Sequence, residues 1–233
     1  GDVYKRQGLT IKNVGENTGL FGYTNNATIS NVTLVGGSIT GSNNVGAVVG
    51  NANNTILNNV VNSAAVNGNS NVGGIVGTAN NTIVKDAVNT GAIEGNSTSE
   101  TNVGGLIGEM KDSNLTDNYS SELIGNSYNL GDVSGDGYNV GGLVGHAVNS
   151  TIGDGTNLVY NRLDVTGAYN VGGIVGNMEG TTVQNAENSG TVTATGHTTE
   201  NYIYHSDYTV NEHNKHNDKG TYDTNGHLSL IHI

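Results

Sequence analysis

One seven-residue motif returns along most of this chain and restricts the folds that are open to it. The copy at 71–77 reads Asn-Val-Gly-Gly-Ile-Val-Gly, and close copies lie at 44–50, 102–108, 139–145 and 170–176, with a shortened one at 17–22. The closing glycines are at positions 22, 50, 77, 108, 145 and 176, so the steps between copies are 28, 27, 31, 37 and 31 residues. Repeats of this length are typical of solenoids, in which each repeat stacks on the next.

Each repeat contains three short runs that fit strands. The first is the motif itself, and the second is a Thr followed by an aliphatic residue, with Asn114-Leu115 as the exception. The third places one aliphatic residue between polar or small neighbours; these residues are Ile39, Val66, Ile93, Val133, Val165 and Val192. Runs this short between Gly and Asn turns favour strands over helices. We therefore predict an all-β fold, a parallel and right-handed β-solenoid or β-helix of about six three-stranded coils.

Two local features of the repeat allow structural predictions. Alternation along the second run places Ile inward and Thr outward. The paired glycines of the motif indicate a corner that needs a positive φ or a close approach of backbone to core. Ile75 and Val76 are both apolar although they should face opposite sides. Either a bulge at the glycines turns the strand, or another element covers its outer face.

The ends of the chain differ from the repeats. Residues 3–7 and 228–233 resemble translated sequencing-adapter sequence, which predicts that 1–7 and 228–233 are non-native flanks of a metagenomic fragment. The β-solenoid is expected over 8–197, followed by a polar tail or partial cap over 198–233. The longest repeat carries an insertion over 120–129, next to Tyr119 and including Tyr128, where a binding loop and a tolerated loop are both open readings.

The charge balance excludes several classes of partner. Twenty acidic and eight basic residues give a formal net charge of −12, and the repeats contain only Lys12, Lys85, Lys111 and Arg162 as basic residues. Nucleic acids and anionic membranes require clustered basic side chains, so neither is an expected partner. No apolar run is long enough to insert into a membrane. The chain has no cysteine, which excludes disulfides and thiolate chemistry.

Candidate metal sites are weak in this sequence. His213 and His216, with His205 nearby, form a His-x-x-His pair without a third ligand at a fixed spacing. Asp132, Asp136 and Asp154 lie beside glycine turns, yet none matches a twelve-residue calcium loop. We therefore expect no metal and no cofactor.

Catalytic signals are equally sparse. Glu94, Asp132 and Asp164 occupy similar positions around the third run, and Asp132 and Asp164 could be neighbours on successive coils, as a pair of glycosidase carboxylates would be. Turn residues exposed to solvent are the simpler interpretation. We predict no catalytic residue, and the sequence does not identify the binding residues or the ligand.

The Val-Gly-Gly-Leu/Ile-Val-Gly motif, followed by Thr-Ile and the third run, resembles the GLUG motif repeat over about residues 17–197. The resemblance implies a bacterial, extracellular or cell-surface setting, because such repeats occur in adhesin-like proteins and in some immunoglobulin A peptidases. It leads us to expect a non-catalytic stalk or adhesive segment that contacts a host protein or glycan. A carbohydrate-active β-helix and an accessory domain of a large secreted peptidase are the alternatives.

Overall fold

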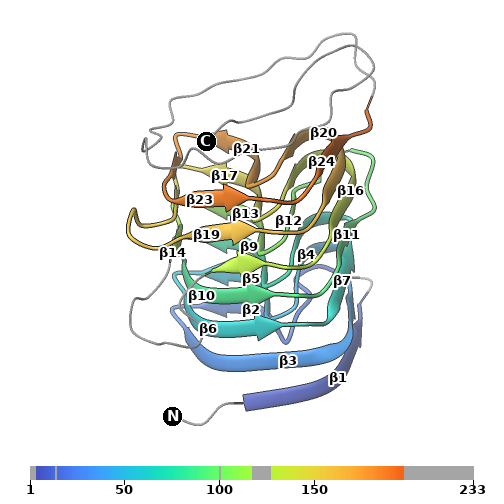
Figure 1. The fold of residues 1–233 in the computed structure, drawn as a ribbon. Coiled ribbons are helices and arrows are strands. Elements are labelled where there is room, and N and C mark those ends of the chain that lie inside the picture. The colour runs from blue at the N-terminus through green and yellow to red at the C-terminus, as the bar shows by residue number, and fades with distance from the viewer. Residues whose placement is uncertain (1–3, 14, 100, 117–126, 197–233) are drawn as a thin grey trace.

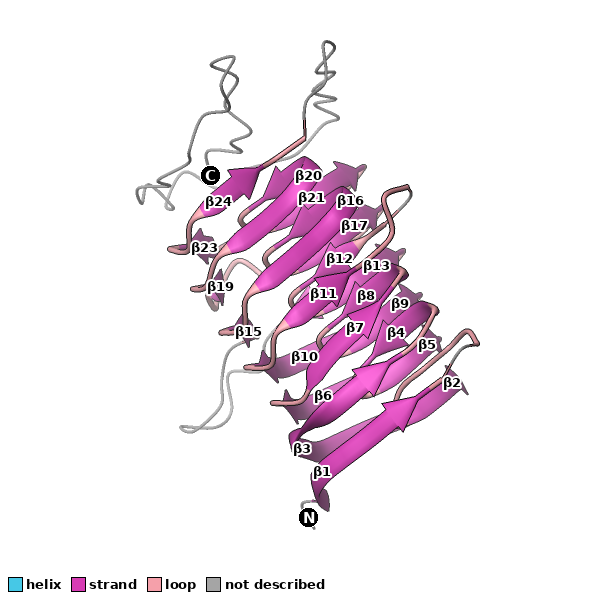
Figure 2. Cartoon of the chain, turned by 90° about the vertical axis from the view of Figure 1, so that its right-hand side faces the viewer, coloured by secondary structure: helices cyan, strands magenta, loops and turns pink. Residues whose placement is uncertain are grey.

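The computed structural model describes residues 4–13, 15–99, 101–116 and 127–196. These residues form one rod of stacked coils, with the N-terminal strand at one end (Figure 1). The strands pair in parallel, each with its counterpart in the next coil (Figure 2). No helix occurs among the described residues, so none there could cross a membrane. The prediction of an all-β parallel β-solenoid of about six turns is confirmed.

The first face of the rod is a six-stranded sheet with one strand from each coil. Every strand begins at the apolar residue that precedes the last glycine of the motif. Its members are β2 (Phe21–Asn25), β5 (Val49–Asn53), β9 (Val76–Asn80), β13 (Ile107–Lys111), β17 (Val144–Val148) and β21 (Val175–Glu179).

An 18-stranded sheet wraps the remaining two faces. The second face comprises the first part of β3 (Thr28–Thr40) and β6 (Ile56–Asn62), β10 (Ile83–Asn89), β14 (Asn114–Thr116), β15 (Tyr128–Asn129), β18 (Thr151–Ile152), β19 (Val159–Asn161), β22 (Thr182–Val183) and β23 (Ala186–Asn188). The third face comprises the last part of β3 and β4 (Asn43–Gly46), β7 (Ala65–Gly68), β8 (Ser70–Gly73), β11 (Ile93–Gly95), β12 (Val103–Gly104), β16 (Val133–Gly141), β20 (Val165–Gly172) and β24 (Val192–Ala194). β1 (Tyr4–Lys12) pairs with β3 at the N-terminal end.

The core consists of aliphatic columns that run along the rod. The third-run column pairs residue by residue, as predicted, and its members are buried: Ile39, Val66, Ile93, Val133, Val165 and Val192. Each β-branched side chain fits the pleated, half-buried surface of its strand. Because each column continues from coil to coil, apolar surface is buried between coils as well as within them.

The seven-residue motif is a corner between two faces. In the copy at 71–77, β8 ends at Gly73 and β9 begins at Val76, so the chain changes sheet between them. Ile75 and Val76 are both fully buried for this reason, and neither a bulge nor a covering element is needed. The paired glycines serve close approach, since a Cβ at Gly73 would overlap the carbonyl oxygen of Val76. They do not have a positive φ, which was the other alternative predicted from the sequence.

The expected alignment of the second run is wrong in two coils. Ile56 pairs with Thr28 and with Ile83, so these isoleucines lie in the outward column, and Ile56 is 39% exposed. Thr55 and Thr82 are instead buried one residue earlier, in a Ser/Thr column. The hydroxyl of Thr82 accepts a hydrogen bond from the backbone N of Thr55 in the preceding coil at 3.3 Å. The hydroxyls of Ser113, Ser150 and Thr181 accept in the same way from the backbone N of the preceding column member at 3.0–3.2 Å. This column satisfies the backbone donors of a buried corner.

Asparagine forms two ladders along the rod. The outer ladder lies at the start of the motif, and each amide Nδ2 donates to the Oδ1 of the preceding coil at 2.7–3.0 Å; its members are Asn17, Asn44, Asn71, Asn102, Asn139 and Asn170. All but Asn102 have φ between 49° and 60°, a region that asparagine tolerates better than most residues.

The inner ladder is buried and runs in the opposite direction. Each Nδ2 donates at 2.8 Å to the Oδ1 of the following coil, through Asn62, Asn89, Asn129, Asn161 and Asn188. Each amide also donates at 2.7–2.9 Å to the carbonyl oxygen two residues further on. The inner corner therefore has few unpaired polar groups, although it lies in an apolar core.

The predicted boundaries meet the described residues only in part. β1 extends across residue 7, where the boundary between a non-native flank and the solenoid was expected. The non-native origin of residues 1–7 stays a prediction. The shortened first copy is in register again at Phe21, which pairs with Val49, so its missing residue falls in the corner. The insertion expected over 120–129 ends earlier than predicted, because Tyr128 and Asn129 form β15 and pair with β10 and β19. Residues 117–126, and with them Tyr119, are outside the described residues, as are 197–233 with His205, His213 and His216.

Candidate binding surface

The two aspartates suggested by the sequence are neighbours on the third face. Val133 pairs with Val165 where β16 and β20 begin, so Asp132 and Asp164, the residues just before these strands, lie on adjacent coils, and both are exposed. The Oδ1 of Asp164 accepts a hydrogen bond from the backbone N of Thr191 at 2.9 Å. Asp164 thus stabilises the next coil, which is a structural use of the carboxylate.

Glu94 does not share the position of these aspartates. It pairs with Ser134, two residues beyond Asp132, and its Oε2 accepts a hydrogen bond from the Nδ2 of Asn67 at 2.8 Å. The prediction that Glu94 occupies a position similar to those of Asp132 and Asp164 is therefore wrong. The sequence could not show this difference because both positions flank the same aliphatic residue.

Asp154 closes a turn in the loop between β18 and β19. Its Oδ1 accepts hydrogen bonds from the backbone N of Thr156 at 2.8 Å and of Asn157 at 2.9 Å. Partial burial would raise the pKa of the Asp154 carboxyl, but the hydrogen bonds from Asn157 and Thr156 outweigh it and lower the pKa. Asp136 is exposed on β16. Within the described ranges, no group of three or more His, Asp or Glu side chains could hold a metal ion.

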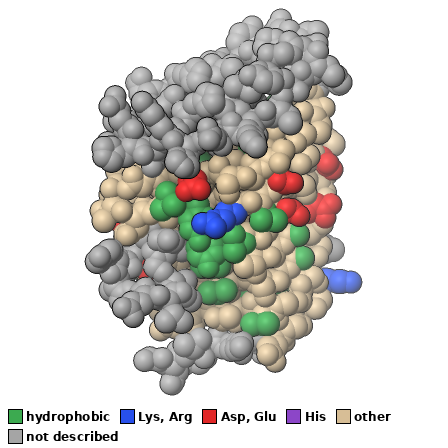
Figure 3. Space-filling view, in the orientation of Figure 1, with side chains coloured by type: hydrophobic (Ala, Val, Ile, Leu, Met, Phe, Trp, Pro, Cys, Tyr) green, Lys and Arg blue, Asp and Glu red, His purple; other side chains and the backbone are tan. Residues whose placement is uncertain are grey.

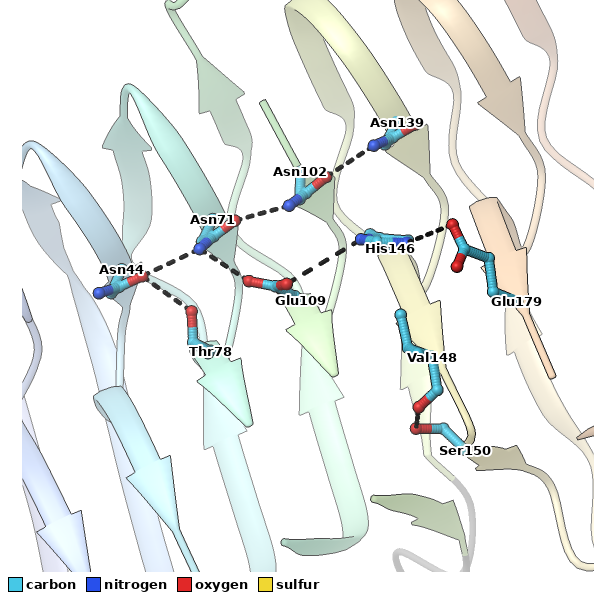
Figure 4. Close-up of polar contacts among 10 residues, drawn as sticks. All are labelled: Asn44, Asn71, Thr78, Asn102, Glu109, Asn139, His146, Val148, Ser150 and Glu179. Atoms are coloured by element: carbon cyan, nitrogen blue, oxygen red, sulfur yellow. Dashed lines mark hydrogen bonds and ion pairs between the residues drawn. The ribbon is translucent and has the colours of Figure 1, made fainter. Parts of the chain in front are cut away.

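A histidine between two glutamates lies on the first face, and sequence reasoning missed it (Figure 4). The Nδ1 of His146 on β17 is 4.0 Å from Glu109 Oε1 on β13, and its Nε2 is 3.7 Å from Glu179 Oε1 on β21. Asn71 connects this group to the outer ladder by donating to Glu109 Oε2 at 3.0 Å. The three residues come from successive coils, so only the register of the strands brings them together.

The second face carries an aromatic and basic surface. Val61, Val88, Tyr128 and Tyr160 follow one another in one outward column. The two tyrosine rings are stacked with centroids 4.8 Å apart and planes at 2°, and the Cζ of Arg162 lies 4.6 Å from the centroid of Tyr160. Val88 is only 3% exposed, so the surface consists of Val61, Tyr128, Tyr160 and Arg162, and we call these four residues the tyrosine–arginine patch. Figure 3 shows hydrophobic side chains gathered around basic ones in the middle of this face.

The patch differs in charge from the third face. Lys85 and Arg162, two of the four basic residues within the repeats, belong to the second face, together with Asp86, Asp154 and Glu187. By contrast, the third face between β11 and β20 carries four acidic residues and, among its described residues, no basic one; these are Glu94, Asp132, Asp136 and Asp164. The second face is therefore the better candidate for contact with a partner, because it joins apolar surface to cations.

A second tyrosine pair lies on the third face. The rings of Tyr138 and Tyr169 are stacked with centroids 4.7 Å apart. Tyr138 is 41% exposed, but no basic side chain accompanies this pair among the described residues of β16 and β20. Stacked tyrosines alone follow from the parallel register, since equal residues on adjacent coils stack.

Comparison with known proteins gives a fold relative. No family model matches the chain, and no curated protein matches it either. Among solved structures, the chain is similar to the crystal structure of a "putative immunoglobulin A1 protease" from Bacteroides ovatus, with a TM-score of 0.59 and 17% sequence identity. The match covers 96% of this chain and 65% of that protein, so the chain spans about two thirds of its length. At this identity the similarity shows a shared fold.

Proposed function

We propose that the chain is a non-catalytic repeat segment of a bacterial cell-surface or secreted protein, where it acts as a stalk and as an adhesive surface. The observation that carries the proposal is the tyrosine–arginine patch, an outward surface of stacked rings and one guanidinium on a rod held by continuous side-chain ladders. The outer ladder connects all six coils, and the inner ladder and the hydroxyl column connect the last five, which makes the rod a stiff support. A sequence that resembles GLUG repeats is consistent with this role.

A specific observation favours one alternative. The similarity to the Bacteroides ovatus structure supports an accessory domain of a large secreted peptidase, in which this segment would position the catalytic domain or its substrate. Recovery of the full reading frame separates the two proposals. A peptidase motif on the same chain supports the accessory role, and a wall anchor without such a motif supports the stalk.

The carbohydrate-active alternative depends on Asp132 and Asp164, which lie on adjacent coils. We expect no release of reducing ends when the wild-type chain is incubated with a panel of polysaccharides. Turnover that is lost in Asp132→Asn and Asp164→Asn, and retained in the control Asp136→Asn on the same face, would replace the non-catalytic proposal with glycan cleavage.

A further inference from the structure

The exposed parts of the tyrosine–arginine patch are limited by how its rings are stacked. One face of the Tyr160 ring is covered by Tyr128 at 4.8 Å. The guanidinium of Arg162, 4.6 Å from the same centroid, therefore covers the opposite face. Sugar rings bind aromatic side chains face to face, so Tyr160 has no ring face left for a glycan. At Tyr160 the patch therefore offers a ring edge and one guanidinium, beside the ring of Tyr128 and the aliphatic surface of Val61.

Arg162 is the residue that defines the partner. Its side chain is exposed, and no carboxylate of the described residues lies within 4.0 Å of it, although the chain has a net charge of −12. Stacking on Tyr160 holds the guanidinium in place, so less side-chain freedom is lost when it binds. A planar guanidinium in this state is best matched by a carboxylate, which can accept two parallel hydrogen bonds.

The surroundings of Arg162 add specificity. The third face is acidic between β11 and β20, so a ligand carboxylate is repelled there; on the second face Glu187 pairs with Tyr160, and the attractive contact for a carboxylate is Arg162. Tyr and Arg beside aliphatic surface are the residues that contribute most to protein–protein interfaces. We propose, building on the adhesive role above, that the tyrosine–arginine patch docks an extended polypeptide that places an Asp or Glu carboxylate on Arg162 and a neighbouring apolar side chain against the edge of Tyr128 on the adjacent coil.

The test uses the full chain and a phage-displayed library of random 12-residue peptides. We expect enriched peptides to contain Asp or Glu beside an aliphatic or aromatic residue. A synthetic peptide of the enriched sequence should bind Arg162→Gln at least tenfold more weakly than wild type, because a charge-assisted pair is lost. The matched control Lys85→Gln, on the same face, should bind within about twofold of wild type.

A second comparison identifies the group on the peptide. Replacing its acidic residue by the amide should weaken binding to wild type by the same factor and should cause no further loss with Arg162→Gln. Three results would overturn the proposal: no acidic enrichment, equal losses in Lys85→Gln and Arg162→Gln, or Arg162-dependent binding of oligogalacturonate in place of peptide. None of these results bears on whether the chain is catalytic, which the polysaccharide assay decides separately.

Discussion

Replacement of Asn129 by Ala tests the inner ladder at a fully buried position in its middle. The side chain donates to Asn161 Oδ1 at 2.8 Å and to the carbonyl oxygen of Gly131 at 2.7 Å. It accepts from Asn89 Nδ2 at 2.8 Å and from the backbone N of Gly131 at 3.2 Å. At about 1 kcal/mol net for each bond, the four sum to about 4 kcal/mol. Unpaired buried partners add to this, so we expect a loss of about 4–6 kcal/mol in the free energy of unfolding.

The assay is urea unfolding followed by circular dichroism, with Asn114→Ala as the matched control. Asn114 is in the same coil but exposed, so its replacement should change the free energy of unfolding by less than about 0.5 kcal/mol. The dependence of the free energy of unfolding on urea concentration should be the same in both variants, because both expose the same surface area when they unfold. A loss below about 1 kcal/mol in Asn129→Ala would refute the claim that the ladder stabilises the coils.

Two further predictions concern other parts of the rod. Gly142→Ala should lower the melting temperature by several degrees in a thermal scan, because a Cβ there would overlap the carbonyl oxygen of Gly173. In the control Gly15→Ala the added Cβ meets only the flexible side chain of Asn13, so the melting temperature should change less. Equal shifts in the two variants would contradict the close approach of the backbone at Gly142. The turn closed by Asp154 should be present above the pKa of an unfolded aspartate and lost as pH falls through its lowered folded pKa, because the hydrogen bonds need the carboxylate. Amide shifts of Asn157 in an NMR titration should follow that transition, and an amide that does not respond would count against the turn.

The repeat period and the aliphatic columns were predictable from the sequence. A column such as Val133 and Val165 has polar or small neighbours in every copy, and one side chain per coil must face the core. The corner at Gly73 was harder to assign, because a strand that turns at two glycines and a strand that bulges there have the same letters. Only the positions of β8 and β9 distinguish them.

The slip in the second run has a simple cause. Thr occupies both the buried corner column, as in Thr55 and Thr82, and the outward column, as in Thr28. An alignment of the repeats on their Thr-Ile pairs therefore equates residues, such as Thr28 and Thr55, whose true positions in the coil differ by one residue. Backbone register, which depends on the length of each corner, decides between them.

The candidate surface could not be predicted from the sequence. Tyr128 and Tyr160 are separated by 32 residues and by a loop, and Arg162 reaches the ring only because alternate residues of one strand share a side. The inner ladder did leave a signal, since Asn89 and Asn129 each lie two residues before a glycine that their amides bond. That signal is easily lost in a chain so rich in Asn and Gly.

Disulfide trapping tests most directly whether the repeats stack in register in one rod. The chain has no cysteine, and Ser134 pairs with Thr166 across adjacent coils. Paired Cα atoms on neighbouring strands lie about 4.8 Å apart, within disulfide range, whereas a shift of two residues raises the distance to about 8 Å. The variant with Ser134→Cys and Thr166→Cys should form an intramolecular disulfide rapidly under mild oxidation, and the variant with Ser134→Cys and Asp164→Cys should not. Equal rates, or faster closure of the second pair, would contradict the stacked solenoid.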